Sequence, residues 1–128
     1  MTWTGRYVGR PFGEGKGEFT CWALLRAVYA EQLGIDLPAY GEIGAADLLR
    51  VARAMERDKD SDPWREVVEP RAFDVAVMRR RKVAGHVGVM VDANRVLHVE
   101  KATNACIEDV RDWPVRHRLV GFRRHATQ

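Results

Sequence analysis

The pattern of apolar and polar residues divides the chain into a helical first part and a strand-rich second part. Apolar side chains cover most of the surface of a predicted helix that begins at Cys21 and ends before Gly34. A second helix is predicted over 45–57, where apolar residues recur at helical spacing with charged residues on the opposite face. From Trp64 onward the period changes to that of short strands.

Five short strands are predicted in the second part. They cover 74–79, 86–91, 95–100, 106–110 and 117–123. Turn signals separate them at 80–85, 92–94, 102–104 and Trp113-Pro114. Such short gaps favour antiparallel pairing. Helices followed by strands predict an α+β fold, with N-terminal helices packed on a C-terminal antiparallel sheet of about five strands.

Composition restricts the class of protein further. A chain of 128 residues, 46% hydrophobic and 30% charged, is typical of one globular domain, which we place over 1–128. No apolar run approaches the ~18 residues that a membrane span needs, so we expect no membrane insertion. Residues 1–6 contain no apolar signal-peptide core, which predicts synthesis in the cytoplasm without a secretion signal and two cysteines that stay as thiols.

The net charge of +3 is a mild positive bias. The basic run 79–82 falls between two predicted strands, as either a solvated hairpin tip or a contact for an anionic polymer. It lacks interleaved aromatic residues and a recognition motif, so we expect no nucleic-acid partner. His117 and His125 lie in a basic C-terminal stretch and are expected to face solvent.

Cys21 stands at the first turn of the predicted central helix. Thr20 precedes it as a plausible N-cap, whose hydroxyl accepts a hydrogen bond from a backbone N–H of that turn. The positive end of the helix dipole stabilises a thiolate, which is the nucleophilic form of cysteine. The alternative is structural, because a cysteine often serves as a small buried hydrophobe.

His86 and His98 lie on two consecutive predicted strands. A three-residue loop over 92–94 would put His98 opposite Gly88. Both imidazoles then point to the same face as diagonal neighbours, roughly 7–8 Å apart at Cα. Gly88 is expected to leave open space between them, and the Cys21 helix to pack on the same face.

These three residues suggest nucleophilic catalysis. Cys21 would attack a carbonyl carbon, His86 would accept the thiol proton, and His98 would fix the tautomer of His86. Backbone N–H groups at the helix start would hold the oxyanion. The alternative is that each histidine is a satisfied structural residue within its strand.

The same residues resemble the NlpC-type cell-wall cysteine peptidases. The pattern is a cysteine at a helix start, a strand that begins His-Val-Gly, and a polar residue about a dozen positions later. Here these are Cys21, His86-Val87-Gly88 and His98. The likeness extends to the segments 7–12, 33–38, 73–78 and 119–124, and is closest to stand-alone forms encoded in phage tail and gene-transfer-agent clusters.

The resemblance implies a papain-like fold and cleavage of peptidoglycan stem peptides, typically at the D-γ-glutamyl–diaminopimelate bond. It implies Cys21, His86 and His98 as catalytic residues and no cofactor or metal. It also implies a component of the phage tail tip that binds peptidoglycan and other tail proteins. Such an enzyme would be made in the host cytoplasm and act on the host cell wall during entry.

Three positions depart from the family pattern. Thr20 stands where the family usually has Asp, Ala23 where it has a small residue such as Gly, and Phe12 where a hydroxylated aromatic is common. Tyr7 is a possible substitute for that aromatic. We therefore assign Tyr7 and Thr20 to substrate binding, and expect these departures to alter substrate preference.

The sequence is compatible with two other classes of function. One is a zinc module with Cys21, His86, His98 and Cys106 as ligands, although the close-spaced ligand pairs of zinc sites are absent. The other is a catalytically weak or inactive tail protein that keeps the fold as a structural or wall-binding element. The departures at Phe12, Thr20 and Ala23 favour this second alternative.

Overall fold

The computed structural model describes residues 3–37, 64–80 and 83–128. The predicted helix over 45–57 and the tip of the basic run 79–82 lie outside these residues. The helical elements are the 3-10 helix η1 (Trp3–Arg6), α1 (Cys21–Val28), the π-helix η2 (Tyr29–Leu33) and α3 (Trp113–Arg116). The strands are β1 (Trp64–Val67), β2 (Val75–Arg80), β3 (Val83–Met90), β4 (Arg95–Glu100), β5 (Thr103–Asp109) and β6 (Leu119–His125).

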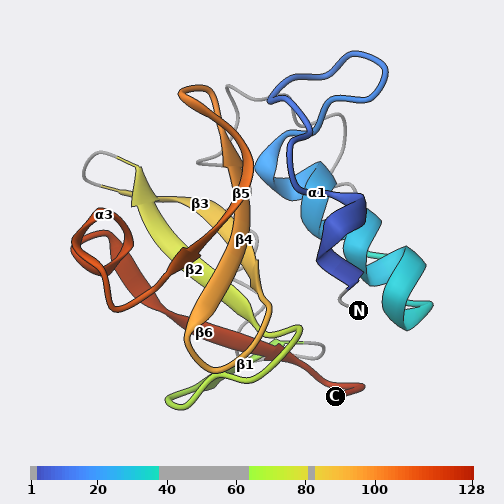
Figure 1. Ribbon diagram of the computed structural model, residues 1–128. Coiled ribbons are helices and arrows are strands. Elements are labelled where there is room, and N and C mark those ends of the chain that lie inside the picture. Colours follow the sequence, from blue (N-terminus) through green and yellow to red (C-terminus); the bar gives the residue numbers. More distant parts are fainter. Residues whose placement is uncertain (1–2, 38–63, 81–82) are drawn as a thin grey trace.

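The strands form one antiparallel sheet in the order β1-β6-β2-β3-β4-β5, with α1 on one side of it (Figure 1). The α+β prediction is confirmed. Within the described residues the sheet has six strands instead of about five, because β1 pairs with β6 through Trp64 opposite His125. His125 is buried in that pairing rather than solvent-facing, and its ring packs edge-on against Trp64.

The helix that begins at Cys21 ends as the sequence predicts. Thr20 is the N-cap, and its hydroxyl accepts a hydrogen bond from the Ala23 N–H at 3.2 Å. Gly34 closes the segment in the left-handed region with φ of 68°, where a residue without Cβ is favoured. The last turn is a π-helix, so the segment is not one uniform α-helix.

The sheet buries an apolar layer on each face. The core on the α1 face joins helix residues to Val75, Val77, Val87, Val89, Leu97 and Val99. The core on the other face contains Ala76, Met78, Met90, Val96, Val110, Val115 and Phe122. Successive strand residues alternate between these two cores, as side chains of a pleated strand must.

Two predicted turns differ from the structure. Trp113 and Pro114 begin the short helix α3, where a proline in the first turn forfeits no hydrogen bond. Thr103 and Asn104 already belong to β5, so the β4–β5 turn is only Lys101 and Ala102. Among the described residues, no helix combines the length and apolarity needed to cross a bilayer.

Candidate active site

Cys21 is the first residue of α1 and lies in the core on the α1 face, 1% exposed. Two backbone hydrogen bonds to Ala105 of β5 fix the segment before Cys21 to the edge of the sheet. The Gly9 N–H donates to the Ala105 carbonyl at 2.8 Å, and the Ala105 N–H donates to the Arg10 carbonyl at 2.7 Å. The loop and the helix start are therefore held beside the end of the sheet that carries the β4–β5 hairpin.

The two histidines are in direct contact. His86 Nε2 lies 2.8 Å from His98 Nδ1, and both side chains are buried. The ladder pairs Val89 with Leu97 and Met90 with Val96, which extends to His98 opposite Gly88. The register predicted from the three-residue loop over 92–94 is confirmed, and with it the placing of both imidazoles on one face.

Gly88 does not leave open space between the histidines. A Cβ at this position would lie 2.6 Å from Val96 Cγ2 and 3.0 Å from both His98 Cβ and the Leu97 carbonyl oxygen. Strand β4 fills the volume that a side chain would need. The glycine therefore permits the close approach of β4, which brings His98 within hydrogen-bond distance of His86.

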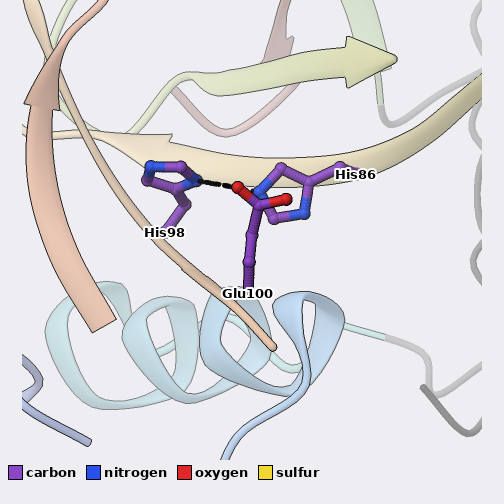
Figure 2. A group of neighbouring side chains, drawn as sticks. All are labelled: His86, His98 and Glu100. Atoms are coloured by element: carbon purple, nitrogen blue, oxygen red, sulfur yellow. Dashed lines mark hydrogen bonds and ion pairs between the residues drawn. The ribbon is translucent and has the colours of Figure 1, made fainter. Parts of the chain in front are cut away.

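Two glutamates that we did not predict as site residues complete the polar cluster. Glu108 of β5 places Oε2 at 2.6 Å from His98 Nε2. Glu100, at the end of β4, lies with His86 and His98 (Figure 2), and its Oε1 is 3.8 Å from His98 Nδ1. Glu108 lies two residues after Cys106, and Cys106 pairs with His98. The sequence did not predict this pairing, because the strand was expected to begin only at Cys106.

Arg118 determines the charge of Glu100. Its Nη1 and Nη2 donate to the two carboxylate oxygens of Glu100, each at 2.8 Å. Burial alone would raise the pKa of Glu100, but the hydrogen bonds from Arg118 and the nearby positive charge outweigh it and lower the pKa to about 2. Glu100 therefore stays ionised beside the histidines.

The histidines alternate along their strands with residues of the apolar core that contains Cys21. His86 and His98 alternate with Val87, Leu97 and Val99, which pack on the α1 face. Whether the Cys21 sulfur faces the two imidazoles stays a prediction.

A cavity of about 370 Å³ lies beside His86 and the β4–β5 turn. It is lined by Phe12, His86, Val99, Glu100, Lys101, Ala102 and Arg118. Phe12 comes from the loop that leads to Cys21 and forms a bridge with Phe19, two residues before the cysteine. The approach loop and His86 therefore border one space.

Tyr7 and Thr20 have structural contacts. Tyr7 is 1% exposed, and its hydroxyl donates to Glu31 Oε1 at 2.6 Å and accepts from Gln32 Nε2 at 3.3 Å. Burial, helped by the hydrogen bond to Glu31, raises the pKa of Tyr7. The Thr20 hydroxyl caps α1. Their assignment to substrate binding stays a prediction.

The four residues of the zinc alternative do not form one group. Ligating atoms lie within 4.8 Å of one another in two sets of described residues, His86 with His98 and Glu100, and His98 with Cys106 and Glu108. Neither set includes Cys21. Burial and the charge of Glu108 raise the pKa of the Cys106 thiol, which opposes the thiolate form that binds metals.

Comparisons with known proteins identify the family and the fold of the chain. The model of the NlpC/P60 family matches residues 9–124. A search of curated proteins finds no match.

Two solved structures share the fold. One is described as similar to a lipoprotein of the NLP/P60 family from Staphylococcus aureus, with a TM-score of 0.63 and 24% identity over 93% of this chain and 37% of that chain. This chain thus spans about a third of the length of that relative. The other is the NlpC/p60 domain of the peptidoglycan hydrolase SagA, with a TM-score of 0.58 and 18% identity over 94% of this chain and 90% of that chain. With the family match over nearly its whole length, the chain belongs to the NlpC/P60 family.

Proposed function

We propose that the protein is a cysteine endopeptidase that hydrolyses the stem peptides of peptidoglycan. The observation that carries the proposal is the buried imidazole pair of His86 and His98 in a domain of the NlpC/P60 family. A fold relative, SagA, is named a peptidoglycan hydrolase. An imidazole that meets a helix-start cysteine activates the thiol as a nucleophile, and a second imidazole can orient the first.

In the proposed reaction, the Cys21 sulfur attacks the carbonyl carbon of a peptide bond while His86 takes the thiol proton. Collapse of the tetrahedral intermediate breaks the C–N bond, and His86 returns the proton to the leaving amine. Water, deprotonated by His86, then attacks the thioester carbon. The C–S bond breaks, the product leaves with its new carboxyl group, and His86 returns the proton to the Cys21 sulfur. In this proposal the sulfur and the imidazole meet at the cavity that His86 and Phe12 line.

The substrate and setting form the finer part of the proposal. We place the cleaved bond between D-γ-glutamate and diaminopimelate, and the enzyme in a phage tail tip that opens the host wall locally. Partners would then be peptidoglycan and neighbouring tail proteins. The support is the likeness to stand-alone phage-type peptidases in the sequence.

Digestion of purified peptidoglycan tests this function. Wild type should release shortened muropeptides whose new amino terminus identifies the bond, and Cys21→Ala should release none. Cys106→Ala is the matched control, because it removes the other thiol, and it should cleave at the wild-type rate. Equal product from wild type and Cys21→Ala would exclude Cys21 as the nucleophile.

The second candidate is a structural or wall-binding tail protein without catalysis. The 1% exposure of Cys21 favours it, because a nucleophile must reach its substrate. Alkylation separates the two functions. The enzyme predicts rapid reaction of Cys21 with iodoacetamide near neutral pH, and the structural protein predicts a thiol as slow as an ordinary buried cysteine.

A further inference from the structure

His98 is held at both ring nitrogens. Its Nδ1 faces His86 Nε2 at 2.8 Å, and its Nε2 faces Glu108 Oε2 at 2.6 Å. His98 is 1% exposed, so no water competes strongly for these positions, whereas the Glu108 side chain is 37% exposed. The chain Glu108–His98–His86 thus runs from the solvent edge of β5 to the cavity.

We propose that Glu108 is a positioning residue that sets the proton on each ring of the pair. A carboxylate has only acceptor oxygens, so the contact at 2.6 Å requires a proton on His98 Nε2. In a neutral imidazole the other nitrogen is then an acceptor. His98 Nδ1 must therefore receive the hydrogen bond from His86 Nε2–H.

The consequence for catalysis rests on the proposed function. With its proton on Nε2, neutral His86 has a bare Nδ1, which is the lone pair that a general base needs. Without Glu108, His98 can carry its proton on Nδ1 and donate to His86 Nε2. His86 then bears its proton on Nδ1 and cannot take one from a thiol.

Glu100 cannot replace Glu108 in this role. Its closest oxygen lies 3.8 Å from His98 Nδ1, beyond hydrogen-bond range, and Arg118 binds both of its oxygens. A hydrogen bond to Glu100 would also place the proton on Nδ1, the opposite tautomer. The two glutamates therefore act differently: Glu108 accepts a hydrogen bond from His98, and Glu100 forms an ion pair with Arg118.

Nitrogen NMR of ring-labelled histidine tests the inference directly, because protonated and bare ring nitrogens have distinct shifts. At a pH where both imidazoles are neutral, the wild type should show His86 and His98 protonated on Nε2 alone. Glu108→Ala should shift part of both populations to Nδ1. Glu108→Gln should keep the wild-type pattern, because its amide oxygen also accepts. Glu69→Gln, an exposed glutamate outside the site, is the matched control and should change nothing.

The rate of Cys21 alkylation provides the second measurement. Glu108→Ala should slow it ~10–100-fold, less than the ~10⁴-fold cost of a wrong tautomer in a serine protease, where the carboxylate touches the base itself. Glu108→Gln should restore most of the rate. The rate is measured in a Cys106→Ala background, so that only Cys21 can be alkylated.

Two results would overturn the inference. One is a wild-type His98 that is protonated on Nδ1 or on both nitrogens, and the other is a Glu108→Ala protein with unchanged ring protonation. If Glu108→Ala does not fold, the tautomers of the wild type and the ring protonation of Glu108→Gln still test the inference. Wild-type tautomers as expected, with no peptidoglycan cleavage, would support the proton arrangement and reject the proposed function.

Discussion

Glu100 keeps a negative charge in a half-buried place because Arg118 donates to both of its oxygens. The pair sits at the wall of the cavity that His86 also lines. The charge of the Glu100 carboxylate therefore affects both the electrostatic potential at the histidines and the stability of the strand end. The second effect is measurable without knowledge of the substrate.

Glu100→Gln should change how stability depends on pH. The folded pKa of about 2 lies below the ordinary 4.5, so between these values the unfolded chain binds more protons. The wild type gains this stability fully above pH about 4.5 and loses it as pH falls toward 2. After allowance for partial exposure, the contribution is on the order of 1–2 kcal/mol.

Urea unfolding across this pH range measures the effect. The difference in unfolding free energy between wild type and Glu100→Gln should shrink steadily as the pH falls. Glu69→Gln, in an exposed position, should track the wild type. A difference that stays constant with pH would show that the Arg118 pair does not lower the pKa of Glu100.

Gly88→Ala should destabilise the protein by overpacking. Its Cβ would lie 2.6 Å from Val96 Cγ2 and 3.0 Å from the Leu97 carbonyl oxygen, so β4 must move. We expect a loss of ~1–3 kcal/mol in thermal or urea unfolding. Gly5→Ala is the control, because nothing lies within 4 Å of its added Cβ. Equal stability of the two variants would contradict the close approach.

The sequence predicted the histidine pair but not the glutamates beside it. Strand alternation and a three-residue loop suffice to place His86 and His98 on one face. Glu108 needs the register of β5, which depends on a two-residue turn and a ladder irregularity between His98 and Glu100. Whether Cys21 meets the histidines depends on how the helix packs, which no local pattern contains.

The start of α1 is capped by one side chain, that of Thr20. Thr20→Ala removes the hydroxyl that accepts from the Ala23 N–H and should cost ~1 kcal/mol in chemical unfolding. Thr20→Ser keeps the acceptor and should stay within a few tenths of a kcal/mol of wild type. Equal losses for both variants would show that the threonine methyl, and not the cap, stabilises the helix start.

The elements that the sequence predicted are those whose signals are local. The α1 segment has a cap, an apolar surface and a closing glycine within one stretch, and β3 and β4 share one short loop. β1 has four residues, and only Trp64 is buried. Its partner β6 lies some sixty residues away in the chain, so its pairing leaves no local trace.

The Asp74 carboxylate links the segment before β2 to strand β6. Its Oδ1 and Oδ2 accept from Arg124 Nε and Nη2 at 2.9 and 2.8 Å, and Oδ2 also accepts from the Arg71 N–H at 2.9 Å. The preceding residue, Phe73, has a φ of 72° and its carbonyl accepts from the Tyr29 hydroxyl. This junction thus joins η2, the start of β2 and the end of β6.

Asp74→Asn should be the most destabilising of the variants considered. It leaves Arg124, whose side chain is 13% exposed, without its charged partner, and a broken buried pair costs ~3–5 kcal/mol. Asp36→Asn, at an exposed site, is the matched control and should change stability little. The double variant Asp74→Asn with Arg124→Gln removes both charges and should recover part of the loss. A double variant as unstable as the sum of the singles would show that the two residues act independently, and that β2 and β6 are held by backbone pairing and the apolar cores instead.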